Sequence, residues 1–286
     1  MKHGTIGKAV LMAMSVCMHA FAADVSAAAS KLNAEGVEFV RNGEIGKAMD
    51  SFKAAIDADA HCVEAARNLG KLLIAAKRYA VAEKLLDMTA KNNPDDVGTF
   101  VQSAQNAALM GKKAECETAV RRVAELDRTA LPSLALLLSG QNTGDCAEFA
   151  ARLAVERNPS DAEAWFDNGI VAQRAGRTSD AVAAYSKAVE LKPDYADAWV
   201  NLGNMQDALG KTDEAIASYE KAHAADSANP LALYNLGRML LLKGKNPAKG
   251  IDLLQEATRY GDDPGAAAAR NLLLGLLSKN GKGGAK

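Results

Sequence analysis

Large apolar residues and glycines recur along the chain with a period of 34 residues, counted from Ala162, Ala196 and Pro230 as position 1. In each period, the apolar positions 4, 7 and 11 have helical spacing, so they predict a first helix with one buried face. Apolar residues near position 24 predict a second helix that packs on this face. The recurrence is clearest in two columns: Trp165, Trp199 and Leu233, and Gly169, Gly203 and Gly237. A period of this length predicts stacked helical hairpins.

Turn residues mark the ends of these predicted helices. Glycine follows the first helix in five of the periods, where a left-handed backbone costs this residue least. These glycines are Gly43, Gly111, Gly176, Gly210 and Gly244. Pro94, Pro159 and Pro193 follow second helices, which proline cannot extend. Small residues at positions 8 and 20, such as Gly203 and Ala215, allow the two helices of a hairpin to approach closely.

The residue types of the period resemble those of the tetratricopeptide repeat (TPR). That family has a large residue at position 4, leucine and glycine at 7 and 8, alanine at 20 and 27, an aromatic residue at 24 and proline at 32. In the period 162–195 the matching residues are Trp165, Gly169, Ala181, Tyr185, Ala188 and Pro193. The resemblance implies an all-α fold, a right-handed superhelical solenoid of about seven helix-turn-helix units with a C-terminal capping helix.

The same frame divides the chain into repeats and flanking segments. The expected solenoid covers 23–278, with repeats at 29–62, 63–96, 97–130, 131–161, 162–195, 196–229 and 230–263. The repeat 131–161 is degenerate, because its first helix is limited to Leu131–Ser139. The repeat 230–263 has an extra residue in its turn around Asn246 and Pro247. A cap helix is expected at 264–278, since a terminal repeat must cover its apolar face, and a flexible tail at 279–286.

The first 22 residues have the pattern of a signal peptide. Lys2 and Lys8 precede a short apolar core, and Ala22 ends a small-x-small cleavage site. We therefore expect cleavage after Ala22 and an exported, periplasmic or secreted protein. The alternative is a lipid-anchored assembly factor attached through Cys17. Val16 argues against it, because the lipid-attachment signal has a small residue before the cysteine.

Composition narrows the class of protein further. Hydrophobic residues make up 49% and charged residues 24% of the chain, which is typical of a globular protein. The formal net charge of −1 gives no basic surface of the kind that binds nucleic acid, so no nucleic-acid partner is expected. No segment after the predicted signal peptide is long and apolar enough to predict a transmembrane span.

The resemblance to the TPR family implies that certain positions of the first helices face a concave groove. In the three best-matching repeats, these positions hold Phe166, Ile170, Arg174, Val200, Asn201, Asn204, Tyr234, Asn235 and Arg238. Phe166, Val200 and Tyr234 would form a partly exposed apolar stripe, or else pack on neighbouring helices. Asn201 and Asn235 would form an amide ladder for a peptide backbone, although asparagine is also the common family residue there. Arg174 and Arg238 would bind an acidic group, or pair with a neighbour such as Asp207.

Residues for catalysis or cofactor binding are not recognisable. Gly210, Lys211 and Thr212 resemble part of a phosphate-binding loop, but the glycine required upstream is Met205 and the context is a helical turn. After residue 22 the only histidines are His61 and His223, far apart in the predicted array. The sequence therefore predicts a protein that is not an enzyme and that holds no cofactor or metal ion.

Three cysteines follow the predicted signal peptide. Cys116 and Cys146 both fall near the start of second helices in adjacent repeats. An exported protein permits a disulfide between them, which would brace the degenerate repeat. The alternative is a pair of small buried thiols. Cα atoms more than about 7 Å apart would exclude the bond.

These features predict a protein-protein interaction scaffold of the cell envelope, because the predicted signal peptide directs export. The partner would be an extended peptide or a protein surface bound in the concave groove, and its identity does not follow from the sequence. The alternative function is a structural repeat protein that self-assembles, and a homo-oligomer therefore stays open.

Overall fold

The computed structural model describes residues 27–140 and 143–283. The predicted signal peptide, Cys17 and residues 284–286 of the predicted tail lie outside the described residues. Helices account for most of the described chain, and it contains no strand. The all-α prediction is thereby confirmed.

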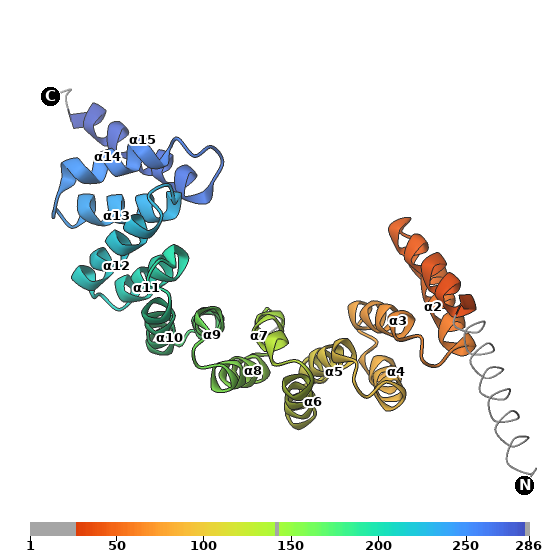
Figure 1. Ribbon diagram of the computed structural model, residues 1–286. Helices are drawn as coiled ribbons and strands as arrows, with labels where there is room; N and C mark the ends of the chain where they lie inside the picture. Colours follow the sequence, from red (N-terminus) through yellow and green to blue (C-terminus); the bar gives the residue numbers. More distant parts are fainter. Residues whose placement is uncertain (1–26, 141–142, 284–286) are drawn as a thin grey trace, which may run out of the picture. The chain divides into compact units, whose positions relative to one another are not determined.

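The helices follow one another as hairpins joined by short turns (Figure 1). A first helix spans residues 27–41. The other elements are α2 (Ile45–Ala58), α3 (Val63–Ala75), α4 (Tyr79–Asn92), α5 (Val97–Leu109), α6 (Lys113–Leu126), η1 (Arg128–Ala130), α7 (Leu131–Ser139), α8 (Gly144–Arg157), α9 (Ala162–Arg174), α10 (Thr178–Leu191), α11 (Ala196–Ala208), α12 (Thr212–Ala225), α13 (Pro230–Leu242), α14 (Pro247–Ala257) and α15 (Pro264–Gly283).

The chain divides into two compact units. The N-terminal unit comprises Met1–Leu131 and Gln141–Cys146, and the C-terminal unit comprises Pro132–Gly140 and Ala147–Lys286. The division falls inside the predicted degenerate repeat, whose two helices are α7 and α8. The short first helix that the sequence predicts at Leu131–Ser139 is present as α7. The irregular repeat therefore coincides with the boundary between the units.

The turns between paired helices depend on left-handed backbone conformations. Gly43, Gly111, Gly176, Gly210 and Gly244 all have positive φ, between 67° and 76°. This confirms that the glycines end the first helices, because only glycine adopts such angles without a steric cost. In the repeat 63–96 the corresponding residue is Lys77, which has φ of 57°. That turn therefore has the same left-handed backbone conformation, which costs a lysine more free energy than a glycine.

Glycine at position 8 makes room for an aromatic ring from the second helix of the same hairpin. Phe52, Tyr185 and Tyr219 occupy position 24, and each is at most 1% exposed. A Cβ atom added at Gly36, Gly169 or Gly203 would lie 2.5–2.6 Å from the ring of the paired aromatic residue. Glycine at position 8 therefore leaves space for the aromatic ring at position 24. It also allows the close helix crossing that the sequence predicts.

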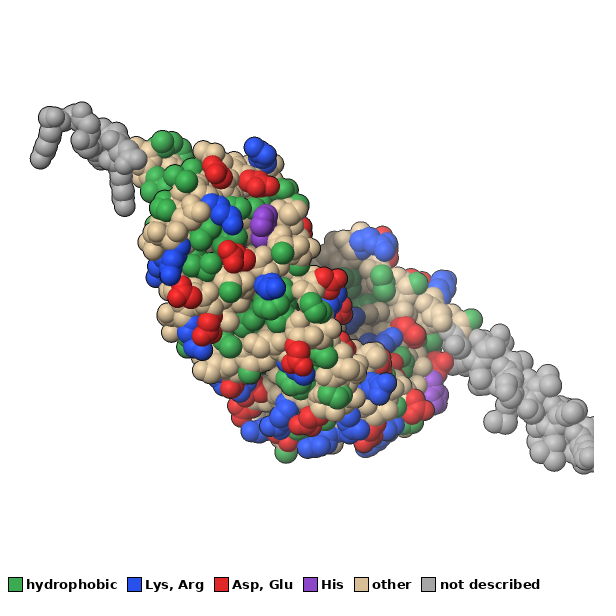
Figure 2. Space-filling model, turned by 60° about the vertical axis from the view of Figure 1, so that its left-hand side comes forward, with side chains coloured by type: hydrophobic (Ala, Val, Ile, Leu, Met, Phe, Trp, Pro, Cys, Tyr) green, Lys and Arg blue, Asp and Glu red, His purple; other side chains and the backbone are tan. Residues whose placement is uncertain are grey.

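Acidic and basic side chains are interspersed over the face of the molecule in Figure 2. This agrees with the nearly equal numbers of the two types, 34 Lys and Arg against 35 Asp and Glu. Neither sign of charge gathers into a stripe on that face. None of the described helices combines the length and the apolar character that crossing a bilayer requires.

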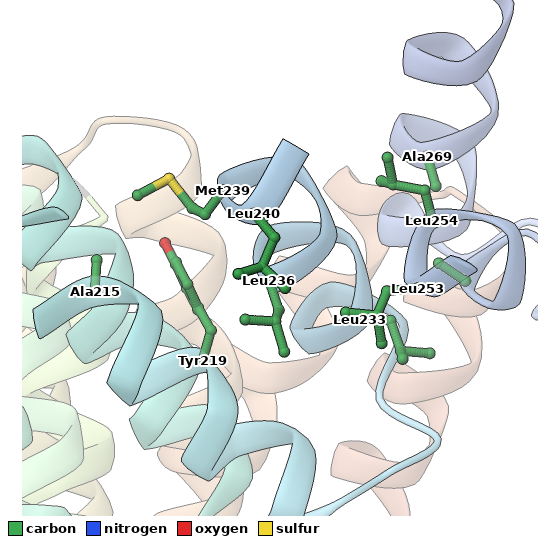
Figure 3. Packing of buried hydrophobic residues seen from close by; sticks show 10 residues of the cluster. Ala215, Tyr219, Leu233, Leu236, Met239, Leu240, Leu253, Leu254 and Ala269 are labelled. Carbon is green, nitrogen blue, oxygen red and sulfur yellow. The ribbon is translucent and has the colours of Figure 1, made fainter. Parts of the chain in front are cut away.

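The last hairpin and α15 share one hydrophobic core in the C-terminal unit. Figure 3 shows side chains from α12, α13, α14 and α15 meeting in this core, including Tyr219, Leu236, Leu254 and Ala269. Each of these four residues is at most 1% exposed. The helix α15 thus covers the apolar side of the last hairpin, as a capping helix does.

The helix α15 continues to Gly283, beyond residue 278, where the sequence predicted that the cap helix ends and a flexible tail begins. Leu274 and Leu277 near this end are 63% and 68% exposed. The end of α15 therefore presents apolar surface that the last hairpin does not cover.

Candidate protein-binding surface

The predicted groove residues all belong to α9, α11 and α13, the first helices of three successive hairpins in the C-terminal unit. Local sequence sets where these helices begin. The Asp161 carboxylate accepts hydrogen bonds from the backbone of Glu163 and Ala164 at the start of α9, and Asn229 caps α13 in the same way. Because α11 also contacts α13 directly, their side chains can form one surface.

Phe166 packs within the molecule. Its ring centroid lies 4.8 Å from that of Tyr195 and 5.7 Å from that of Tyr185, with tilted planes typical of favourable aromatic pairs. The residue is half-buried, and Ile170 beside it is half-buried as well. Part of the Phe166 ring is therefore open to a partner, and the rest packs on Tyr185 and Tyr195 and stabilises the fold.

Val200 packs within the molecule and does not extend an exposed apolar stripe. The side chain is 3% exposed and packs with Ala222, Ala232 and Trp199. The next hairpin covers position 5 of α11, which is the packing alternative that the sequence left open. Tyr234, at the same position of α13, is half-buried against the core of α12 to α15.

The amide side chains form a hydrogen-bonded network that joins two hairpins. The Tyr219 hydroxyl donates to Asn204 Oδ1 at 2.8 Å, and Asn235 Nδ2 donates to the same oxygen at 3.3 Å. Burial raises the pKa of Tyr219 to about 12, so its hydroxyl stays protonated at neutral pH. Asn235 is only 7% exposed, so little of its amide is open to a partner.

Asn201 is the predicted ladder amide that stays accessible. Its side chain is half-buried and lies near the Tyr185 hydroxyl, which donates a hydrogen bond to Gln173 Oε1 at 2.8 Å. Part of the amide is therefore open to a partner. Because an amide both donates and accepts hydrogen bonds, it is suited to pair with a peptide group.

The two predicted arginines are engaged within the chain. Arg238 Nη2 lies 2.8 Å from Asp207 Oδ2, and both side chains are about one-quarter exposed, 26% and 25%. Arg174 is exposed, and its Nη1 donates to Ser139 Oγ at 2.6 Å. The alternative in which Arg238 pairs with Asp207 is thus the one that the structure contains.

Asp167 is a residue whose importance the sequence did not indicate. Burial raises its pKa to about 6, and the charges of Glu163 and Asp161 add to the shift. It forms no ion pair among the described residues. Its place at position 6 of α9 was visible in the sequence, but the loss of solvent around its carboxylate depends on tertiary packing.

Cys116 and Cys146 lie side by side in the N-terminal unit, with Cα atoms 6.4 Å apart. Both are buried, at 0% and 4% exposure. Their separation is within the range that a disulfide requires. The bond itself stays a prediction that a thiol measurement can test. Cys62 is buried and pairs with no other cysteine of the described residues.

Family models of the tetratricopeptide repeat match residues 39–99, 166–230 and 207–267. With the helical hairpins and the turn glycines, these matches define the chain as a helical repeat protein. It belongs to the tetratricopeptide repeat family. TPR proteins bind protein partners, and the family is one of interaction scaffolds.

The solved structure of yeast Tom70 agrees with this fold, with 16% identity and a TM-score of 0.50, and the match covers 88% of this chain and 54% of that chain. Two further solved structures are similar to parts of the chain. MamA has 22% identity and a TM-score of 0.45, with 55% and 92% covered. A tetratricopeptide repeat protein from Parabacteroides merdae has 14% identity and a TM-score of 0.44, with 85% and 99% covered. No curated protein sequence matches the chain significantly.

Proposed function

We propose that the chain is a non-enzymatic scaffold that binds an extended peptide segment of a partner protein along α9, α11 and α13. The observation that carries the proposal is a row of partly exposed side chains on a rigid network. Asn201, Tyr234 and Asp167 are half-buried. Hydrogen bonds from Tyr219 to Asn204 and from Arg238 to Asp207 fix α11 and α13, and one from Tyr185 to Gln173 fixes α9 to α10. Such a surface loses little conformational freedom when a partner binds.

Asp167 adds a preference for charge in the bound segment. It is acidic, forms no ion pair with the residues that the structure describes, and lies near Glu163 and Asp161. A basic side chain opposite Asp167 would compensate its partly desolvated carboxylate, which neutral or acidic segments cannot do. The proposed partner segment is therefore extended and carries a lysine or arginine.

Export to the cell envelope is part of the proposed function. The pattern of Lys2, Lys8 and Ala22 supports it. Determination of the N-terminal sequence of the protein from its native cells tests this proposal. A mature chain that begins at Ala23 is expected. An intact Met1, or a lipid on Cys17, would contradict cleavage after Ala22.

Site-specific photo-crosslinking in native cells tests the binding surface. A photoreactive residue at Asn201, on the proposed surface, is expected to give a defined adduct with a partner protein. The matched control places it at Lys221, an exposed residue of α12, the second helix of the same hairpin. Adducts at Lys221 alone, or equally at both positions, would contradict the proposal.

Self-association is a second candidate function, favoured by one observation. Leu274 and Leu277 are 63% and 68% exposed at the end of α15, one helical turn apart. Sedimentation of the purified chain, compared with the double variant Leu274→Ser and Leu277→Ser, tests it. A concentration-dependent oligomer that the double variant loses supports self-association. A wild-type monomer at all concentrations would exclude it.

A further inference from the structure

A cavity of about 530 Å³ lies among α4, α5 and α6 in the N-terminal unit, outside the groove proposed above. Its volume is within the usual range of small-molecule sites, about 300–1,000 Å³. The wall is mainly apolar, with Leu86 from α4, Phe100 and Ala107 from α5 and Ala119 from α6. The cavity is a separate feature of the molecule, and nothing in the scaffold function requires it.

One residue accounts for the open space. Ser103 lines the cavity at position 7 of its repeat, where Leu69, Leu202 and Leu236 fill the core of other repeats. The Ser103 hydroxyl donates to the Thr99 carbonyl at 3.0 Å, so the serine is satisfied within its own helix. A small residue at a position that usually holds leucine leaves a pocket in place of packed core.

The rim of the cavity is acidic. Glu83, Asp87 and Glu115 line it, and Lys112 forms an ion pair with Glu83. Arg122 also lines it. Its guanidinium is held by Glu125 at 3.0 Å, by the Pro94 carbonyl at 2.9 Å and by Asp95 at 3.4 Å. Asp87 and Glu115 have no ion pair within 4 Å among the described residues, so a net negative charge remains at the rim.

A buried acceptor lies in the same wall. Asn106 is 2% exposed and donates through Nδ2 to the Tyr79 carbonyl at 3.1 Å, while its Oδ1 accepts no hydrogen bond from the described residues. Buried acceptors without a donor are uncommon in native structures. This oxygen has almost no accessible surface, so it marks imperfect packing of the wall and not a contact for a ligand. No cluster of three or more His, Cys, Asp or Glu in the described chain is arranged for a metal ion. The unpaired carboxylates at the rim and the apolar wall instead fit an organic cation.

We propose that this cavity binds a small amphipathic amine, whose ammonium group faces Asp87 and Glu115 and whose apolar stem lies on Leu86 and Phe100. The cation compensates the acidic rim and donates hydrogen bonds. The stem fills the space that Ser103 leaves.

Titration calorimetry of the purified chain with n-hexylamine, hexan-1-ol and hexanoate tests the proposal. Hexylamine is expected to bind saturably, hexanol about threefold or more weakly because it lacks the charge, and hexanoate not at all. Binding of hexylamine should also weaken as salt rises, because the rim charges are exposed. Equal binding of all three probes, or no saturable binding of hexylamine, would overturn the proposal.

Two variants locate the site. Ser103→Leu is expected to abolish hexylamine binding by filling the cavity, and Asp87→Asn with Glu115→Gln is expected to weaken it about threefold. Glu117→Gln, on α6 but outside the cavity, is the matched control and should bind like wild type. Circular dichroism confirms the folding of each variant. Unchanged binding by the carboxylate variant would overturn the proposal even if Ser103→Leu did not fold.

The same titration with Nα-acetyl-lysine methylamide distinguishes the source of the amine. This probe presents an ammonium group on a four-carbon stem, as a lysine of a partner protein does. It is expected to bind more weakly than hexylamine, because its backbone amides are poorly matched to the apolar wall. Tighter binding of the lysine probe would make the cavity a docking site for a partner's lysine, and would overturn a free amine as the ligand.

Discussion

At the scale of single residues, the fold depends on pairs that the 34-residue period brings together. Gly203 and Tyr219 are such a pair, since a Cβ at Gly203 would lie 2.6 Å from the tyrosine ring. The sequence correctly predicted small residues at the crossing of two helices. It could not show that the aromatic ring of position 24 is the group that occupies the space.

Gly203→Ala is expected to destabilise the C-terminal unit by about 1–3 kcal/mol, because the added methyl group overpacks the ring of Tyr219. Gly275→Ala is the matched control, also within a helix but with open space around its Cα. It should stabilise slightly, by up to about 1 kcal/mol, through helix propensity. Chemical denaturation measures both changes. A neutral or stabilising Gly203→Ala would contradict the packing described above.

Lys77→Gly is expected to stabilise the N-terminal unit by roughly 0.5–1 kcal/mol, because Lys77 has a left-handed backbone that glycine adopts without strain. Lys71→Gly is the control. Lys71 lies inside α3 and is also exposed, so glycine there should cost about 1 kcal/mol. Denaturant midpoints of the two variants distinguish the outcomes, and a loss of stability in Lys77→Gly would show that the turn is not strained.

Asp167→Asn is expected to stabilise the protein at pH 7.5 by about 1 kcal/mol. The folded chain raises the pKa of Asp167 from 3.8 to about 6, so the ionised form destabilises the native state at neutral pH. We expect a smaller stabilisation than the full pKa shift implies, because the Asp167 side chain is only half-buried.

The effect of Asp167→Asn should depend on pH. As pH falls from about 7 to 4, folded wild-type Asp167 binds a proton before the unfolded chain does, and the advantage of asparagine shrinks. Asp252→Asn, at an exposed position of α14, is the control and should show no such trend. Denaturation curves at several pH values provide the measurement. A constant difference between Asp167→Asn and wild type would be inconsistent with the raised pKa.

At the scale of helices and hairpins, the sequence predicted most of the architecture. The turn glycines, the short α7 and the extra residue before α14 all appear where the period places them. Exposure on the first helices was harder to predict, because positions 5 and 6 face the next hairpin to different extents. Val200 and Asn235 became buried, whereas Phe166 and Tyr234 kept part of their surface.

A disulfide between two hairpins can be tested at this scale. It would join Cys116, near the start of α6, to Cys146, near the start of α8. If the two cysteines form a disulfide, the denatured unreduced protein should have one reactive thiol after residue 22, that of Cys62. Reduction should expose two more. The bond closes a loop with a sequence separation of 30, so its loss should cost about 3 kcal/mol.

Ellman titration under denaturing conditions, with and without reductant, counts these thiols. The Cys116→Ala variant is the control, because its lone Cys146 should react without reductant. Three reactive thiols in the unreduced wild-type chain would contradict the disulfide and favour two buried thiols instead.

At the scale of the whole molecule, the chain combines repeat hairpins, two compact units and a surface of mixed charge (Figure 2). The TPR family accounts for a scaffold that binds proteins. The proposed location and chemistry of binding rest on individual residues: a half-buried amide at Asn201, a partly exposed Tyr234 and a partly desolvated Asp167. Repeat periodicity could not predict these properties, because they depend on neighbouring hairpins and on solvent exclusion.

Hydrogen-deuterium exchange of the C-terminal unit within the full chain tests the central claim most directly. Exchange is measured with and without a synthetic peptide that has the sequence of the partner segment identified by crosslinking. The account predicts slower exchange in α9, α11 and α13 when the peptide is present, with α10, α12 and α14 little changed. Protection confined to the second helices, or no protection at peptide concentrations that saturate binding, would contradict it.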